Sequence, residues 1–274
     1  MDDVSPFDLA ANRTRLAILR ALVAASREGE EPSFSDLRRR AGVDDSGNFN
    51  YHLDQLRGTF VEETDGGYRL SYQGRAVVAP LLAGAYDDYE RDPTPLDVDC
   101  QFCGAGLSAG YADGVVRVGC PNDHAFTHEL PPGSAAERSL EALLELTALS
   151  VRTDADHVRR GVCRLCHGTV ELSLGSSPAP GIDHVFRGTC DRCGRAYRGP
   201  VAMFALTVPE VAEFLRAHGT DPARRPFWEV PFVEAATDVE REPTRVHATF
   251  ERAGASVTAT FDGSGRVATT DYST

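Results

Sequence analysis

The sequence predicts a multidomain α+β protein, and three observations lead to this fold class. Apolar residues recur at helical spacing near the N-terminus, seven cysteines form two clusters in the middle of the 274-residue chain, and the C-terminal part alternates polar with apolar residues. This length fits several small domains. We expect a helical domain with a β-hairpin over 1–92, a first zinc-ribbon-like cysteine module over 93–133, a linking amphipathic helix over 134–160, a second cysteine module over 161–200, and a helix plus an antiparallel β meander over 201–274.

The N-terminal domain has the pattern of a helix-turn-helix followed by a hairpin. Apolar residues at three- and four-residue steps predict a first helix over 7–27. A second helix is expected to begin with Ser35 as its N-cap, and a third follows a glycine-containing turn and covers 46–57. A strand, an Asp-Gly-Gly turn and a second strand over 60–71 predict a hairpin. In this position the hairpin is the wing of a winged helix-turn-helix.

The remaining elements follow from the same two periodicities. A helix is expected over 72–89 and a linker over 92–95. Two short strands within 100–128 are expected to meet at a turn over 111–114. The apolar face of a long helix over 134–159 belongs either to the core or to a dimer interface. Further expected elements are a hairpin within 162–199, a helix over 207–218 capped by Thr207, and strands over 245–250, 255–261 and 266–270.

The third helix of the N-terminal domain has a polar face suited to reading DNA. With Phe49, Leu53 and Leu56 in the core, the opposite face presents side chains that can bond to base edges, and nearby arginines are placed for phosphates. Alternatively, the three consecutive arginines form a solvated face, or the domain binds protein. His52 is expected to point partly inward, as a packed or capping histidine rather than a ligand. The candidate DNA-binding residues are Arg38, Arg39, Arg40, Ser46, Asn48, Asn50, Tyr51, Gln55, Arg57 and Arg69.

The second cysteine cluster has the spacing of a metal site. Two CxxC units are separated by 23 residues, and in a reducing compartment such pairs indicate metal binding rather than disulfides. Zinc accepts four thiolates in a tetrahedral shell, and a complete shell leaves no open position for catalysis. We therefore expect a structural zinc site made by Cys163, Cys166, Cys190 and Cys193.

The composition is acidic and free of lysine. The formal net charge is −13, all 28 basic residues are arginine, and isoleucine occurs twice, at Ile18 and Ile182. An acidic surface keeps a protein soluble in molar salt, where the Debye length falls to about 3 Å. The composition therefore indicates a halophilic protein, with a high-GC genome as the alternative explanation of the arginine bias. Binding of nucleic acid depends on where the arginines lie rather than on the net charge.

Two classes of function are disfavoured by the sequence. No stretch approaches the roughly 18 uninterrupted apolar residues of a membrane span, and the N-terminus has no basic and apolar regions typical of a secretory signal. A cytoplasmic protein is therefore expected. The sequence contains no phosphate-binding GxxxxGKS, no nucleophile elbow and no HExxH motif. We expect a protein that is not an enzyme.

Three segments, over 12–22, 34–37 and 45–53, resemble the ArsR-type winged-helix regulators of haloarchaea. The similarity continues through both cysteine blocks and the C-terminal meander. The resemblance implies a transcriptional regulator that binds double-stranded DNA, usually as a homodimer. The metal-sensing cysteines of the founding ArsR proteins lie on winged-helix elements, whereas the first cysteine here is Cys100. Metal sensing is therefore not implied.

The first cysteine block departs from the pattern of that subfamily. The pattern has a second CxxC unit where this sequence has CPNDH from Cys120 to His124, with Asp123 at the expected cysteine. A slightly longer loop would let the histidine complete a Cys3His site, and His128 is the second candidate. A degenerate, empty site is the alternative. The expected ligands of this second zinc ion are Cys100, Cys103, Cys120 and His124.

Other functions fit parts of the pattern. A general transcription factor resembling archaeal TFE would join a winged helix to a zinc ribbon and contact the transcription machinery at promoters. A zinc- or redox-responsive protein-interaction module would use its acidic body for docking. In each case small ribbons depend on zinc for folding, so we expect the metal sites to brace the protein.

Overall fold

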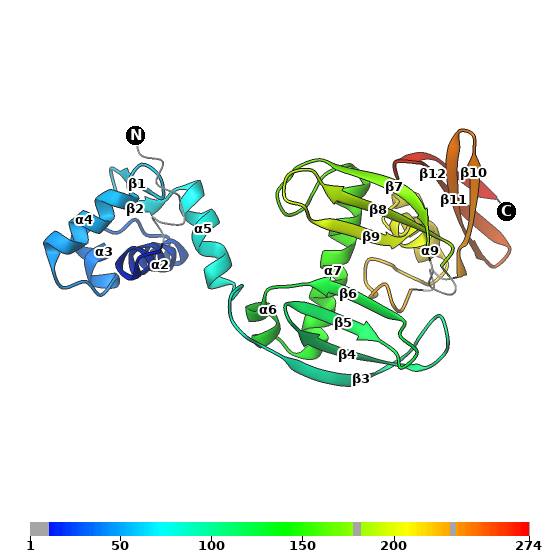
Figure 1. Ribbon diagram of the computed structural model, residues 1–274, viewed down its shortest axis with the longest axis horizontal. Helices are drawn as coiled ribbons and strands as arrows, with labels where there is room; N and C mark the ends of the chain where they lie inside the picture. Colours follow the sequence, from blue (N-terminus) through cyan, green and yellow to red (C-terminus); the bar gives the residue numbers. More distant parts are fainter. Residues whose placement is uncertain (1–10, 178–181, 231–233, 274) are drawn as a thin grey trace. The chain divides into compact units, whose positions relative to one another are not determined.

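Figure 1 shows the computed structural model, which describes residues 11–177, 182–230 and 234–273. Within these residues lie eight helices and four antiparallel sheets, as expected for an α+β protein. The chain forms two compact units, which are Met1–Asp88 with Pro131–Ser134, and Tyr89–Leu130 with Ala135–Thr274. None of the helices in the described ranges combines the length and the hydropathy that crossing a bilayer requires.

The first unit packs four helices and a two-stranded hairpin around one core. Its elements are α2 (Arg13–Glu28), α3 (Phe34–Arg40), α4 (Ser46–Leu56), β1 (Val61–Thr64), β2 (Gly67–Leu70) and α5 (Tyr72–Leu82). Ile18 and Leu22 of α2 pack in the same core as Phe49 of α4 and Phe60. The expected order of three helices, a hairpin and a further helix is present. The part of the first expected helix over 7–10 lies outside the described residues.

Two expected boundaries in this unit are wrong. Ser33, not Ser35, caps α3, because the Ser33 hydroxyl accepts from the amide of Asp36 at 3.3 Å and donates to its carboxylate at 2.8 Å. The last helix ends at Leu82 and does not reach residue 89. The chain leaves the helix at Gly84, whose φ of 64° lies in the left-handed region that favours glycine.

The second unit begins with a four-stranded sheet of order β3-β4-β5-β6. Its strands are β3 (Arg91–Asp99), β4 (Gly106–Ala112), β5 (Val115–Gly119) and β6 (Ala125–Glu129). The expected linker over 92–95 is instead part of β3, which pairs antiparallel with β4. Pro93 and Pro95 are tolerated there because β3 is an edge strand, where a missing backbone N–H leaves no ladder bond unmade. The strand pairing also shifts register within this stretch.

Two helices replace the single long helix expected over 134–159. They are α6 (Pro132–Ala136) and α7 (Leu140–Arg159), and α7 starts anew because the Ser139 side chain accepts from the amide of Ala142 at 3.2 Å. Leu143, Ala148 and Val158 of α7 belong to the core of the second unit. The apolar face of α7 therefore packs within the chain.

Residues after α7 add two more sheets and two short helices. They are β7 (Val170–Ser176), β8 (His184–Cys190), β9 (Ala196–Pro200), α8 (Val201–Ala205), α9 (Pro209–Ala217), β10 (Ala236–Arg241), β11 (Thr244–Arg252), β12 (Ala255–Asp262) and β13 (Val267–Ser273). The final sheet has four strands, and β10 was not expected, since its apolar residues are sparse. Thr207 does not cap α9, because its hydroxyl donates to the carbonyl of Phe204 at 2.8 Å.

One hydrophobic core connects the three sheets of the second unit. The Phe186 ring on β8 meets the Phe204 ring at 5.4 Å and the Phe261 ring on β12 at 5.7 Å, both edge to face. In Figure 1, α7 extends from the β3–β6 sheet to the β7–β9 sheet. The expected segments after residue 92 thus share apolar contacts and pack as one compact unit.

Candidate metal centres and candidate nucleic-acid interface

The four cysteines of the second cluster meet at the end of the β7–β9 sheet. The sulfurs of Cys163 and Cys193 lie 3.7 Å apart, and those of Cys166 and Cys190 lie 3.4 Å apart. All four sulfurs lie within 4.8 Å of one another. Zinc–sulfur bonds of about 2.3 Å in a tetrahedron place sulfurs about 3.8 Å apart. The four side chains could therefore hold one metal ion.

Each half of this cluster is a narrow turn closed by backbone hydrogen bonds. In the first turn, the amide of His167 donates to the backbone carbonyl of Cys163 at 2.8 Å, and the amide of Cys163 donates to the carbonyl of Gly168 at 2.9 Å. The turn from Cys190 has the same two bonds: the amide of Gly194 donates to the carbonyl of Cys190, and the amide of Cys190 donates to the carbonyl of Arg195. His167 and Gly194 take left-handed backbone conformations, with φ of 56° and 74°. This turn points the sulfurs of residues three apart to one side.

Neighbouring groups favour the thiolate form at this cluster. The hydroxyl of Tyr197 lies 3.2 Å from Cys163 Sγ. Burial opposes ionisation of Cys163, but hydrogen bonds from Tyr197 and from two backbone amides outweigh it and lower the pKa of the thiol to about 6. Because the thiolate is the metal-binding form, this environment supports metal binding. The sequence analysis did not identify Tyr197, whose position four residues after Cys193 is its only signal.

The first cluster brings three cysteines and one histidine together. His124 Nδ1 lies 3.5 Å from Cys120 Sγ and 3.7 Å from Cys100 Sγ, and Cys103 Sγ lies 3.7 Å from Cys120 Sγ. These four ligand atoms also lie within 4.8 Å of one another, so the cluster could hold a metal ion. His128 is not in this cluster. It lies on β6, and its buried Nε2 has no hydrogen-bond partner among the residues that the structure describes.

The loop that carries His124 is shorter, not longer, than the other cysteine turns. The amide of Asp123 donates to the backbone carbonyl of Cys120 at 3.2 Å, and the amide of Cys120 donates to the carbonyl of His124 at 3.0 Å. Both closing bonds therefore span one residue less than in the turn from Cys163. Asp123 takes the left-handed position, with φ of 62°. His124 therefore stands at the closing position, and its long side chain reaches back to the sulfurs. The expectation of a longer loop is wrong.

Side chains around the first cluster fix its shape. The side-chain amide of Asn122 donates to Cys103 Sγ at 3.3 Å, and this bond, followed by one from the Ala105 amide, lowers the pKa of Cys103 to about 6. The Phe102 ring lies 5.1 Å from the His124 ring. Gln101 donates to the carbonyls of Trp228 and Val230, at 2.6 and 2.8 Å, and so attaches the turn to the segment after α9.

In the first unit, α4 has one buried face and one exposed polar face. Phe49, Leu53 and Leu56 are buried, as expected. Tyr51 is 61% exposed, and the amide of Asn50 donates to the carboxylate of Asp54 at 3.1 Å. The other expected base-contacting side chains, Ser46, Asn48 and Gln55, are exposed as well.

His52 is half-buried, and its Nδ1 lacks a hydrogen-bond partner among the described residues. Burial, and then the charge of Arg15, lower the pKa of His52. A histidine in this position stays neutral near pH 7, in agreement with a packing role.

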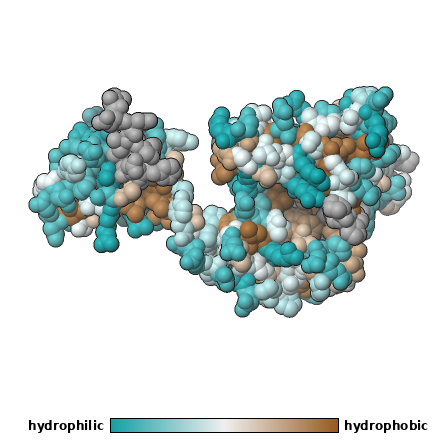
Figure 2. Space-filling model, viewed as in Figure 1, coloured by the Kyte–Doolittle hydropathy of each residue, from teal (hydrophilic) through white to brown (hydrophobic). Residues whose placement is uncertain are grey.

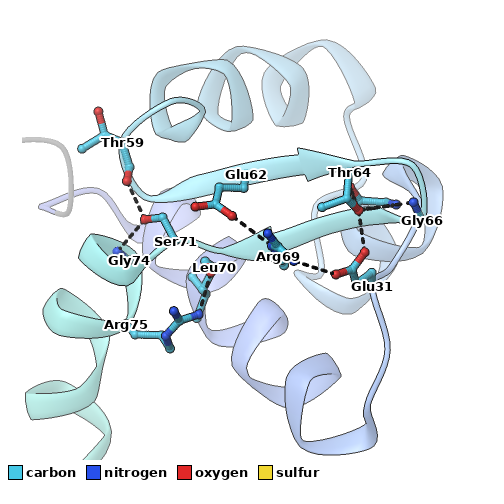
Figure 3. Close-up of polar contacts among 11 residues, drawn as sticks. Glu31, Thr59, Glu62, Thr64, Gly66, Arg69, Leu70, Ser71, Gly74 and Arg75 are labelled. Atoms are coloured by element: carbon cyan, nitrogen blue, oxygen red, sulfur yellow. Dashed lines mark hydrogen bonds and ion pairs between the residues drawn. The ribbon is translucent and has the colours of Figure 1, made fainter.

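The arginines expected at phosphates are paired with groups of the same unit. Figure 3 shows Arg69 of β2 between Glu62, at 2.9 Å, and Glu31, at 3.6 Å. Arg57 contacts Asp54 at 3.2 Å and also Glu63. The three consecutive arginines have partners too: Arg38 donates to the carbonyl of Asp44, Arg39 pairs with Asp36, and Arg40 pairs with Glu28 and Glu30.

Arginines and acidic residues are nearly balanced over the segment that contains these ion pairs. Residues 4–81 contain ten arginines and eleven acidic side chains, whereas the whole chain carries a formal net charge of −13. Exposed ion pairs contribute little to stability and are screened further by salt. The guanidinium groups can therefore exchange their partners at low cost.

The chain matches two families, one in each structural unit. Residues 97–267 match the family described as Domain of unknown function (DUF7351), and residues 4–81 match the family described as Domain of unknown function (DUF7347). Because the first match covers more than half of the sequence, the chain belongs to the DUF7351 family. No curated protein and no solved structure matches the chain.

Proposed function

We propose that this member of the DUF7351 family is a DNA-binding transcriptional regulator of a halophilic archaeon, with an ArsR-type winged helix-turn-helix as its reading domain. The observation that carries the proposal is the division of α4 into a buried apolar face and an exposed polar face. In this proposal α3 and α4 are the helix-turn-helix, and the β1–β2 hairpin is the wing.

The exposed side chains of α4 have the chemistry that base recognition requires. Asn and Gln can form paired hydrogen bonds with adenine N6 and N7 in the major groove, and a Tyr hydroxyl can reach bases or phosphates. Asn48, Asn50 and Gln55 supply the amides, and Tyr51 supplies the hydroxyl. On DNA, Asn50 exchanges its bond to Asp54 for a base edge.

The arginines around α4 serve to position the domain on phosphates. Arg57 lies beside the proposed wing and Arg69 lies on it. The present partners of both are exposed carboxylates. DNA phosphates compete with these carboxylates for the same guanidinium groups. In molar salt the exposed ion pairs are screened, which lowers the cost of this exchange.

We further propose that both clusters hold zinc as a structural brace. The Cys163 cluster supplies four thiolates and the Cys100 cluster supplies three thiolates and one imidazole, and zinc accepts both sets. Four protein ligands fill the tetrahedral shell, so neither ion would have a position open for substrate. The proposed regulator is accordingly not an enzyme. Its proposed place of action is the cytoplasm.

The proposed regulator acts as a homodimer. The first unit exposes aromatic side chains on and after α5, where Tyr72 is 76% and Tyr86 is 74% exposed, and Leu82 adds an exposed aliphatic side chain. Exposed apolar side chains of this size are typical of surfaces that bind protein. A dimer would present two copies of α4 to a palindromic DNA site.

Chromatin immunoprecipitation in native high-salt cells tests the proposal. We expect the tagged wild-type chain to occupy a small number of sites that share a palindromic motif. Asn50→Ala and Tyr51→Ala should each lower that occupancy about tenfold or more, whereas Ser26→Ala, on an exposed position of α2, should leave it unchanged. Broad occupancy of active promoters would favour the TFE-like general factor, and absence of enrichment would favour the protein-interaction module.

A further inference from the structure

The second unit contains a cavity of about 590 Å³ between its two metal-binding modules. Its walls come from β6, α7 and β9, together with Met203, Phe204 and Phe227. In Figure 2 this face of the unit is hollowed between β6 and β9, and brown hydrophobic atoms line the bottom of the hollow. Sites for small organic molecules have volumes of roughly 300–1,000 Å³, so the cavity has a suitable size.

Most of the lining is apolar and comes from rigid elements. Val151, Ala155 and Val158 of α7 contribute one wall, and Phe126 of β6 packs edge to face on Phe227 at 4.8 Å. These side chains are fixed by the core of the unit. The cavity is therefore suited to a compact molecule with an aromatic or branched apolar body.

Charged side chains form part of the cavity lining. Asp154 of α7 is 7% exposed and pairs with Arg164 at 2.6 Å and with Arg195 at 3.2 Å. Arg195 also lies 3.4 Å from Glu129, whose side chain is 71% exposed. The buried carboxylate thus holds one edge of the Arg195 guanidinium, while a solvent-exposed carboxylate holds another.

An unpartnered polar atom lies in the same wall. His128 lines the cavity, and its Nε2 is buried with no hydrogen-bond partner among the described residues. A buried polar atom without a partner carries a desolvation cost that a bound group can remove. His128 and Glu129 both line the cavity, so the His128 ring is a second polar group available to a ligand there.

We propose that this cavity binds a small organic carboxylate with an aromatic or branched apolar body. The carboxylate pairs with Arg195 in place of Glu129, the His128 ring donates a hydrogen bond to the ligand, and the apolar body occupies the space beside α7. An anionic ligand fits the lining because Arg195 and Arg198 both face it and the buried carboxylate of Asp154 already has two arginine partners. This site is independent of the DNA-reading role proposed for the first unit.

Calorimetric titration of the metal-loaded full chain in molar KCl tests the site with 3-phenylpropionate and its neutral analogue 3-phenylpropanamide. We expect saturable binding of the acid and at least tenfold weaker binding of the amide. Arg195→Gln should weaken binding of the acid at least tenfold and leave the amide unaffected. Glu129→Gln, on an exposed side chain, should instead strengthen binding of the acid severalfold because it removes the competing carboxylate.

A pair of variants on α7 locates the binding. Val151→Trp fills the cavity and should abolish binding of both compounds, whereas Leu149→Trp, on a position that is 54% exposed, should leave both affinities unchanged. Thermal melting and metal content establish that each variant is folded. The wild type is also titrated with the shorter and longer acids phenylacetate and 4-phenylbutyrate. Equal affinity for acid and amide, unchanged or weaker acid binding in the Glu129 variant, or no saturable binding of any of the three acids by the wild type would overturn the proposal.

Discussion

At Cys120 the chain turns back one residue earlier than at the other three cysteine turns, and the residue types compensate for this difference. In the other turns the second cysteine comes one residue before the left-handed position, whereas a cysteine at position 123 would itself occupy the left-handed position that Asp123 adopts. His124 is farther along the turn, and its longer side chain brings Nδ1 to within 3.5 Å of Cys120 Sγ. The sequence identifies the histidine, but the backbone bonds that select it are visible only in the fold.

Metal content measures this compensation directly. We expect His124→Ala to lower the metal bound per chain from two ions to one, because three cysteines remain at the first cluster without a fourth ligand. His128→Ala should retain two ions, since His128 lies outside the cluster. Adding Asp123→Cys to His124→Ala should not restore the second ion. Elemental analysis of the purified chains decides, and two ions in the His124 variant would contradict this ligand assignment.

At the scale of single elements, periodicity predicts which helices exist better than where they begin. Ser33 and Ser35 carry the same hydroxyl group, and either could cap α3 as far as the residue type is concerned. Ser33 is selected by its extended backbone, with φ −63° and ψ 167°, which aims its oxygen at the Asp36 amide. The strand β3 was missed for a related reason: its prolines indicate a linker unless a neighbouring strand shows that the edge position tolerates them.

The assignment of this cap has a measurable consequence. Ser33→Ala should destabilise the first unit by about 1 kcal/mol, the usual cost of removing a serine N-cap. Ser35→Ala, its matched control within the helix, should change stability by less than about 0.5 kcal/mol. Hydrogen exchange of peptides from α2 to α4 reports the difference, and about fivefold faster exchange is expected in the Ser33 variant. Equal effects of the two substitutions would refute the assignment.

At the scale of the whole chain, sequence patterns predict local elements but not the core that joins them. The segments expected after residue 92 have separate periodicities, yet Cys100, Cys163, Phe186 and Phe261 belong to one continuous cluster of buried residues. Contacts such as Phe186 with Phe261 join residues far apart in sequence, and no local pattern encodes them. The cavity escaped the sequence analysis for the same reason, because β6, α7 and β9 form it together.

This shared core predicts how metal removal acts on the two units. Cys163 and Cys190 are 0% and 2% exposed, so losing the proposed zinc would leave thiol groups without their ligand inside the core. The first unit contains no cysteine and has a core of its own. A strong chelator should therefore abolish amide protection in β4 and β8 while α2 and α4 keep theirs. Hydrogen exchange before and after chelation measures this, and protection that survives in β8 would show that the second unit folds without metal.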